Sequence, residues 1–138
     1  MSLQDNKDLV RRFVEVVQNQ HNLAALDEFF GPDIVDYGGM SDPPNREGAR
    51  ALLHAFIAAL PDSHFTIHQQ LAEGDRVMTY KTCQATHLGP LAGFPATGLP
   101  VAFNIIDIFR VADGQITGHW LVTDLHGVMM EVSAAAAS

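Results

Sequence analysis

This sequence contains little cysteine and little positive charge, and each shortage excludes certain kinds of site or binding partner. Cys83 is the single cysteine in 138 residues, which excludes an internal disulfide and a metal site built from several cysteines. The chain has 8 Lys and Arg residues against 16 Asp and Glu, and its net charge is −8. Surfaces that bind nucleic acid or anionic membranes need the opposite balance. We therefore expect an uncharged or weakly charged small molecule as the partner.

Long apolar runs and common nucleotide motifs are also missing. No stretch approaches the roughly 18 apolar residues of a membrane-spanning helix, although 47% of the residues are hydrophobic. The start, MSLQDNKDLVRR, lacks the apolar centre and the cleavage site of a signal peptide. The chain has no GxGxxG, GxxxxGK[ST] or GxSxG pattern. We expect a cytoplasmic protein without a membrane segment, a bound nucleotide or a serine nucleophile.

Histidine spacing does not replace the missing cysteines as a source of metal ligands. His64 and His68 fall in a predicted strand, where a separation of four residues is about 13 Å. A shared metal ion would need the helical spacing that brings such a pair together. We predict neither a metal site nor any other cofactor.

Two kinds of periodicity divide the chain. Apolar residues in the first half recur at helical spacing, which predicts three helices, at 3–20, 22–30 and 46–60. A short strand is predicted between the second and third helices, at 34–37. In the second half, alternation of apolar and polar residues predicts strands at 65–73 and 76–87 and a hairpin of two strands at 101–124. A final helical turn is predicted at 125–132 and a frayed tail at 134–138. Residues 1–138 thus predict a single α+β domain, with N-terminal helices packed on a curved antiparallel sheet that encloses an apolar pocket.

The strongest local signal is Asp113-Gly114, which predicts a two-residue turn between two strands. Continuous pairing from this turn would set Asp107 opposite Trp120. Residues directly opposite each other share a face of a sheet. The register therefore predicts one apolar hairpin face, made of alternate residues that include Phe103, Trp120 and Asp124.

Two carboxylates interrupt this predicted apolar face. Burial of Asp107 or Asp124 would shift the carboxyl pKa, so that either group could exchange protons near neutral pH. The alternative for Asp124 is a strand-end residue that caps the following turn. The alternative for Asp107 is a structural hydrogen bond to the Trp120 indole. The same register places His119 on the opposite face, which favours a structural or interface role.

Further residues complete the predicted site. His87 ends a strand beside a Gly- and Pro-rich loop at 88–98, which we interpret as a cover over the pocket. At this position His87 could act in catalysis by orienting a substrate oxygen or helping a carboxylate exchange a proton; the alternative is a histidine bonded to the loop backbone. The predicted substrate contacts are Trp120, Phe103, Asn104, Tyr37, Phe94 and Phe56. An apolar patch on the second hairpin face predicts a homodimer or homotetramer, through Ile106, Ile108 and Leu121.

Several short motifs together resemble the pattern of SnoaL-like polyketide cyclases, small proteins of the nuclear-transport-factor-two-like fold. These are His87-x-Gly89, Gly93 to Gly98, Ile106 to Arg110, Asp113-Gly114 and His119-Trp120-x-x-x-Asp124. The resemblance implies a cone-shaped α+β barrel that closes a polyketide ring by intramolecular aldol condensation, without metal or organic cofactor. It also implies that Asp124 is the acid/base.

The resemblance alone does not fix the reaction, because the family includes members recruited to other chemistry. An isomerase, hydrolase or hydroxylase reaction on the same scaffold is one alternative, and a non-catalytic binding protein for an apolar small molecule is another. Gly118 departs from the family pattern, which commonly has an acidic residue before His-Trp. Its small size could widen the pocket or remove a partner for Arg110.

Overall fold

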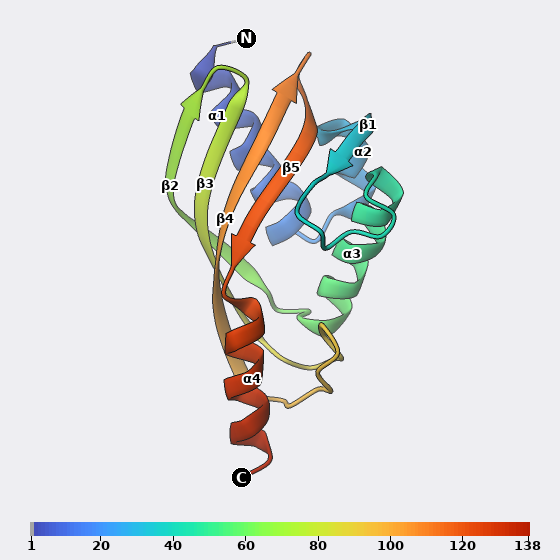
Figure 1. Cartoon of the computed structure of the whole chain (residues 1–138), viewed down its shortest axis with the longest axis vertical. Coiled ribbons are helices and arrows are strands. Elements are labelled where there is room, and N and C mark those ends of the chain that lie inside the picture. Colours follow the sequence, from blue (N-terminus) through green and yellow to red (C-terminus); the bar gives the residue numbers. More distant parts are fainter. Residues whose placement is uncertain (1) are drawn as a thin grey trace.

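The computed structural model describes residues 2–138, and its centre is a five-stranded sheet (Figure 1). The strands are β1 (Phe30–Asp36), β2 (His64–Glu73), β3 (Arg76–Thr86), β4 (Pro100–Ala112) and β5 (Gln115–Thr123). Their order across the sheet is β1-β5-β4-β3-β2. All neighbours pair antiparallel except β1, which runs parallel to β5. The predicted α+β fold is confirmed, with a mixed sheet in place of a purely antiparallel one.

Helices pack against this sheet and extend beyond one of its ends. They are α1 (Leu3–Phe13), the π-helical η1 (Val14–Asn19), the 3-10 turn η2 (Leu23–Ala25), α2 (Leu26–Phe29), α3 (Arg46–Ala59) and α4 (Leu125–Ala136). α1 packs against β2 and β3, and α3 packs against β1. α4 continues past the end of β5 to the C-terminus (Figure 1). It is longer than the predicted helical turn and includes part of the predicted frayed tail.

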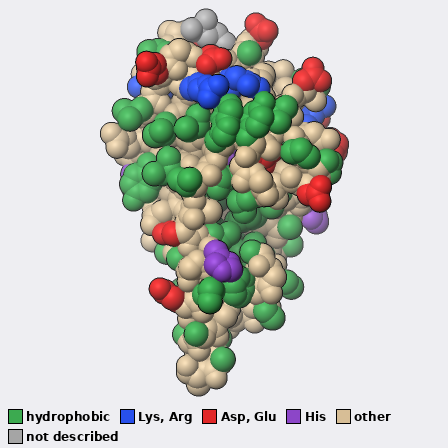
Figure 2. Space-filling view, viewed as in Figure 1, with side chains coloured by type: hydrophobic (Ala, Val, Ile, Leu, Met, Phe, Trp, Pro, Cys, Tyr) green, Lys and Arg blue, Asp and Glu red, His purple; other side chains and the backbone are tan. Residues whose placement is uncertain are grey.

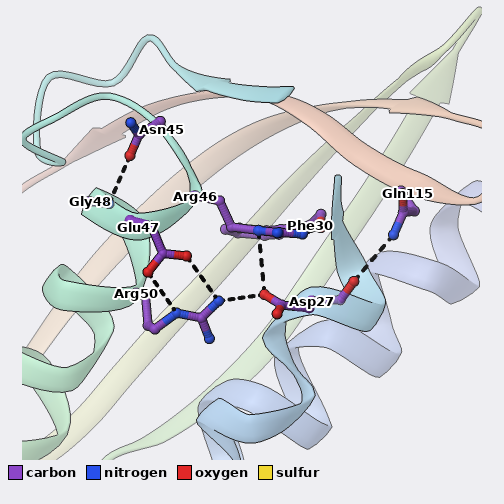
Figure 3. A network of polar contacts seen from close by, with 8 residues as sticks. All are labelled: Asp27, Phe30, Asn45, Arg46, Glu47, Gly48, Arg50 and Gln115. Carbon is purple, nitrogen blue, oxygen red and sulfur yellow. Dashed lines mark hydrogen bonds and ion pairs between the residues drawn. The ribbon is translucent and has the colours of Figure 1, made fainter. Parts of the chain in front are cut away.

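Local sequence sets where α1 and α3 begin. Ser2 Oγ accepts from the Asp5 N–H at 3.0 Å while the Asp5 carboxylate accepts from the Ser2 N–H at 3.1 Å, a reciprocal capping box. Asn45 caps α3 by accepting from the Gly48 N–H at 3.0 Å (Figure 3). A Cβ at Gly48 would lie 1.7 Å from the Pro43 carbonyl oxygen. Glycine therefore allows the preceding loop to lie against α3.

An exposed charge network joins α2 to α3 (Figure 3). The Asp27 carboxylate accepts from Arg50 and lies 3.4 Å from Arg46 Nε, and Arg50 also pairs with Glu47. The Asp27 carbonyl accepts from Gln115 Nε2 at 3.2 Å, which connects the network to β5. Exposed ion pairs contribute roughly 0–1 kcal/mol each. The network contributes little stability and mainly connects α3 to α2, which is bonded in turn to β5.

The turn between β4 and β5 is the predicted one. Asp113 and Gly114 both have positive φ, 51° and 74°, as a two-residue hairpin turn of this kind requires. Ala112 pairs with Gln115 on either side of the turn. The predicted turn and its first residue pair are therefore confirmed.

Beyond this turn, β5 bulges at Thr117. Val111 pairs with Ile116, but the next pair is Arg110 with Gly118, so Thr117 is an extra residue in β5. Arg110 holds the bulge, because its Nε donates to Thr117 Oγ1 at 3.1 Å and a terminal nitrogen donates to the Thr117 carbonyl at 2.9 Å. One extra residue moves every later side chain of the strand to the other face of the sheet.

The core lies between the sheet and the N-terminal helices. Phe13 of α1 is buried with its ring centroid 5.0 Å from that of Phe30 and 5.7 Å from that of Phe109. Burying an aromatic side chain of this size stabilises the fold by about 1.5–3 kcal/mol. Among residues 2–138, no helix is both long enough and apolar enough to cross a bilayer.

Candidate active site

A cavity of about 100 Å³ lies between the sheet and the helices α1 and α3. One water molecule needs roughly 10–15 Å³, so the cavity has room for several waters or for the reacting part of a larger molecule. Most of its wall is apolar and includes Phe13, Val17, Leu53, Phe56, Phe103 and Phe109. Phe56 and Phe103 line the cavity as the sequence predicted, with ring centroids 6.3 Å apart.

Four ionisable side chains enter this apolar cavity from four strands. Lys81 comes from β3, Asp107 from β4, His119 from β5 and Asp36 from the end of β1. The Lys81 side chain is 1% exposed and the Asp107 side chain 4%. Charges buried this deeply are stable only when they are paired and hydrogen-bonded. The four residues must therefore be considered together.

Their side chains form one continuous chain of contacts. Lys81 Nζ lies 2.7 Å from Asp107 Oδ2 and donates to Gln18 Oε1 at 2.9 Å. His119 Nε2 lies 2.6 Å from Asp107 Oδ1, and His119 Nδ1 lies 3.3 Å from Asp36 Oδ1. An ionised carboxylate can only accept hydrogen bonds, so both ring nitrogens donate and His119 is an imidazolium.

The pKa shifts agree with this protonation state. Burial disfavours charge on His119, but its hydrogen bonds to Asp107 and Asp36 outweigh burial and raise the pKa of His119 to about 9. Burial also opposes ionisation of Asp36, yet hydrogen bonds from His119, Ser41 and the Gly38 N–H lower its pKa to about 2. The pKa of Asp107 lies below its usual value because Lys81 and His119 outweigh its burial.

Two further contacts complete the polar part of the cavity. The Phe109 ring stacks on the His119 ring with centroids 4.8 Å apart and an interplanar angle of 17°, which fixes the plane of the imidazole. Ser41 lines the cavity beside Asp36 and is buried. Its hydroxyl lies close enough to the Asp36 carboxylate to help lower the Asp36 pKa. Ser41 thus places a polar group at the cavity wall next to Asp36.

The bulge at Thr117 explains why the sequence assigned the hairpin faces incorrectly. His119 was predicted on the opposite face and lies in the cavity, whereas Trp120 was predicted in the pocket wall and lies on the outer face. Trp120 stacks there on Tyr37, with ring centroids 4.6 Å apart, and Tyr37 is 49% exposed. The predictions that Trp120 and Tyr37 line the pocket are wrong. The alternative Asp107 bond to the indole is replaced by its contacts with Lys81 and His119.

Asp124 does not line the cavity either. It is exposed at the N-cap position of α4, and its carboxylate accepts from the Asn104 backbone N–H at 2.7 Å and from Asn104 Nδ2 at 3.0 Å. The prediction that Asp124 lies on an apolar face is wrong, because the bulge shifts the end of β5. Asn104 does not line the cavity, whereas Leu121, predicted on the second face, does.

The loop at 88–98 docks on the end of α3, outside the cavity wall. The N–H groups of Leu88 and Gly89 donate to the Ala59 carbonyl at 3.0 and 3.1 Å. His87 is fully buried, with Nδ1 3.1 Å from Thr97 Oγ1, and does not line the cavity. Phe94 lies against His126 instead, at 5.7 Å between ring centroids. The predicted pocket positions of His87 and Phe94 are therefore wrong.

Gly118 also lies on the outer face, opposite Arg110. A Cβ at this position would lie 3.0 Å from Arg110 Cζ. The missing side chain leaves space for the guanidinium and does not widen the cavity, contrary to one prediction. Arg110 is instead bonded to Thr117.

Sequence reasoning missed Lys81, His119 and Asp36 as parts of the site. The available signal was the alternation of β3, in which Lys81 falls among the inward-facing residues Val77, Thr79 and Cys83. Within residues 2–138, no group of three or more His, Cys, Asp or Glu side chains is placed to hold a metal ion. The direct pairing of His119 with Asp107 and Asp36 inside an apolar cavity suits proton transfer.

The sequence pattern of a known family covers most of this chain. The family described as SnoaL-like polyketide cyclase matches residues 7–132. The chain belongs to this family. It is also 28% identical over 116 residues to the aklanonic acid methyl ester cyclase DnrD of Streptomyces peucetius, a match that covers 81% of this chain and 79% of DnrD. This SnoaL-like protein is thus a distant relative of polyketide cyclases.

Solved structures share the fold of this SnoaL-like protein. TsrD from Streptomyces laurentii matches with a TM-score of 0.86 at 25% identity, over 97% of this chain and 98% of TsrD. AclR from Streptomyces galilaeus, described as a candidate hydroxylase, matches with a TM-score of 0.83 at 26% identity, over 96% and 98% of the two chains. Relatives with one fold thus carry different reaction names, and the site must decide between them.

Proposed function

We propose that this SnoaL-like protein closes a ring in an apolar, polyketide-like substrate by acid/base catalysis, with Asp36 and His119 as the groups that move protons. The observation that carries the proposal is the buried chain from Lys81 through Asp107 and His119 to Asp36 in a largely apolar cavity. The distant similarity to an aklanonic acid methyl ester cyclase supports the substrate class.

Among the contacts that join these four side chains, the one between His119 and Asp36 is the weakest. His119 Nδ1 lies 3.3 Å from Asp36 Oδ1, compared with 2.6 Å between His119 Nε2 and Asp107 Oδ1. A substrate oxygen inserted at this point would take over the Nδ1 donor. Asp36 would then lose a partner that lowers its pKa, and its carboxylate would become a stronger base. Insertion of one oxygen therefore creates an acid and a base next to each other.

Ring closure needs one proton to leave carbon and one to reach oxygen. Asp36 takes the proton from a carbon next to a carbonyl group, and the enolate attacks a second carbonyl of the same molecule to form the new C–C bond. The oxygen of that second carbonyl receives the His119 proton and becomes a hydroxyl group. Return of the proton from Asp36 to His119 restores both side chains, so the net reaction is a balanced isomerisation.

Asp107 and Lys81 hold the catalytic groups in this charge state. Asp107 stabilises the His119 imidazolium through the short contact, and Lys81 stabilises the ionised form of Asp107. Little water reaches these groups, so each electrostatic interaction is stronger than it would be at the surface. The Ser41 hydroxyl lies at the cavity wall beside Asp36, and we assign it a role in holding a substrate oxygen.

The proposal is tested with linear aromatic polyketide methyl esters as probes, with ring closure followed by absorbance and by chromatography of the product. Asp36→Asn and His119→Gln are each expected to lower turnover by about 10²–10⁴-fold. Asp33→Asn is the matched control, because Asp33 is exposed and does not line the cavity. It should leave turnover unchanged.

Asp124→Asn separates the structural assignment from the one implied by family resemblance. Our assignment predicts that this variant keeps its turnover, since Asp124 does not line the cavity. Loss of turnover in Asp124→Asn with normal turnover in Asp36→Asn would overturn it in favour of Asp124. Binding of the probes without conversion, and a change of affinity alone in Asp36→Asn, would indicate a non-catalytic binding protein.

A further inference from the structure

The first helical segment ends in the π-helical η1, and this changes which of its side chains reach the cavity. Hydrogen bonds in η1 join residues five apart, as between the Gln20 N–H and the Glu15 carbonyl at 3.0 Å. This wider turn brings residues five apart toward the same side, and Phe13 and Gln18 both line the cavity. In an α-helix a step of five residues would separate their directions by about 140°. The π-helical turn therefore brings Gln18 to the cavity wall.

The neighbouring residue Asn19 holds this segment against β2. Its Oδ1 accepts from the Phe65 N–H at 2.7 Å, and its Nδ2 donates to the Phe65 carbonyl at 3.1 Å. Two bonds to one backbone residue limit how far η1 can move. The half-buried side chain of Gln18 is thus positioned before any ligand enters.

A contact with Lys81 fixes the orientation of the Gln18 amide. An ammonium group has three N–H donors and no acceptor, so the amide atom that lies 2.9 Å from Lys81 Nζ is the oxygen, Oε1. The amide nitrogen then lies on the other side of the same planar group. Gln18 Nε2 donates to no other residue in the described part of the chain. Gln18 therefore offers the cavity two N–H donors without a protein acceptor.

Lys81 itself is already surrounded by protein groups. Its Nζ lies 2.7 Å from Asp107 Oδ2 and donates to Gln18 Oε1. It also lies 5.2 Å from the Phe65 ring centroid and 5.9 Å from that of Phe109, within the range of a cation–π contact. A ligand oxygen that reaches this end of the cavity would therefore be bound by the Gln18 amide.

The outer face of the sheet offers no comparable contact for a small ligand. Figure 2 shows a band of hydrophobic side chains on this face, with basic side chains beside it. Trp120 already stacks on Tyr37, and the guanidinium carbons of Arg76 and Arg110 lie 4.5 and 5.8 Å from its ring centroid. The aromatic surface there is occupied by side chains of the protein.

We propose that Gln18 binds a second oxygen of the substrate, an uncharged carbonyl that lies away from the ring being closed. Gln18 and Asp36 lie at opposite ends of the chain of contacts through Lys81, Asp107 and His119. A substrate that reacts beside Asp36 and reaches Gln18 therefore carries oxygen acceptors at both ends. A ketone, quinone or ester carbonyl suits this position better than a carboxylate, because the amide has no charge to compensate for lost hydration.

The reaction beside Asp36 rests on the proposed function, whereas the Gln18 contact is tested by binding alone. The probes are 1-tetralone and tetralin, a bicyclic ketone and the same ring system without the oxygen, and neither can cyclise. NMR titration measures the dissociation constant of each. In Gln18→Glu the new carboxylate still accepts from Lys81 but cannot donate to a ketone. We expect the preference for the ketone, the ratio of the two constants, to fall by about 3–10-fold.

Gln20→Glu is the matched control, because Gln20 is exposed, follows η1 directly and does not line the cavity; its ratio should equal that of the wild type. Gln18→Met also removes the donors and replaces Gln18→Glu if that variant does not fold. A role of Gln18 only in holding Lys81 would weaken both probes equally and leave the ratio unchanged, which would overturn the proposal.

The remaining outcomes separate this subsite from the reaction. A reduced ratio in a protein that converts no polyketide ester would support the Gln18 contact and reject ring closure. Normal ring closure with an unchanged ratio would reject the Gln18 contact alone. If neither probe binds the wild-type protein, the cavity is not a site for apolar ketones and the Gln18 contact is refuted.

Discussion

Neighbouring residues of the same strands face opposite environments on the two sides of the sheet. The inner face holds four ionisable groups within an apolar cavity and keeps them there by direct pairing. The outer face holds apolar side chains toward solvent, with charged groups only at its ends. In β5, His119 belongs to the first face and Trp120 to the second. Which residue faces which environment is decided by a single extra residue, Thr117.

Deletion of Thr117 should have the largest effect on this division. Without the bulge, β5 would turn Trp120 toward the cavity and His119 toward the outer face, because a shift of one residue reverses all later side chains. We expect loss of cooperative unfolding in urea. Thr117→Val is the control: it keeps the residue but loses the hydroxyl bonded to Arg110, at about 0.5–1.5 kcal/mol. A deletion variant that unfolds cooperatively and retains the raised His119 pKa would contradict the argument.

An Asp-to-Asn substitution should lower the free energy of unfolding much more on the inner face than on the outer face. Asp107→Asn removes the charge that compensates the buried Lys81, and breaking a buried pair costs about 3–5 kcal/mol of unfolding free energy. Asp124→Asn changes an exposed carboxylate whose replacement still accepts a hydrogen bond, so its effect should be below about 1 kcal/mol. Urea denaturation of both variants measures the difference. Similar losses would mean that Asp107 is not held as tightly as its contacts indicate.

The inner face should also lose stability in alkali, by no more than the Asp107→Asn substitution costs. The pKa of His119 is raised from 6.5 to about 9 in the folded protein. A raised pKa stabilises the fold fully below pH 6.5, and this contribution is lost as the pH rises through 9. The shift corresponds to on the order of 3 kcal/mol. Urea denaturation from neutral pH upward should show this decline in the wild type and much less of it in His119→Gln.

An equal decline in both proteins would assign the alkaline loss to another group. Asp36 provides an internal comparison, because its pKa is lowered to about 2. Its contribution to the stability of the fold is therefore lost only as the pH falls from 3.8 toward that value. Asp36→Asn should therefore remove part of the loss in acid. The acid and alkaline responses of the cavity thus come from separate residues.

Local sequence signals predicted much of the fold. The helix predicted at 46–60, found as Arg46–Ala59, and the turn at Asp113-Gly114 each depend on nearby residues, and both are present. The parallel pairing of β1 with β5 was not predictable in this way, since it joins segments far apart in the chain. The bulge was missed because Thr117 is an ordinary strand residue, and its partner Arg110 is recognisable only after the strands pair.

The candidate site was predictable only where it did not depend on the register of β5. Asp107, Phe103 and Phe56 line the cavity as expected, because β4 alternation and the α3 apolar stripe place them there. Residues beyond the bulge were assigned to the wrong face. The alternation of β3 places Lys81 among inward-facing residues, but it does not reveal the partner that makes a buried lysine stable, so Lys81 was missed.

The four buried charges of the cavity also have a consequence for what can enter it. Two carboxylates, one ammonium and one imidazolium sum to zero at neutral pH, so the cavity has no net charge to offer an ionic guest. A guest with a free carboxylate would lose its hydration without gaining a counter-ion. The same molecule capped as an ester would not meet this penalty. If the proposed reaction is correct, we expect the cavity to favour an esterified substrate over its parent acid.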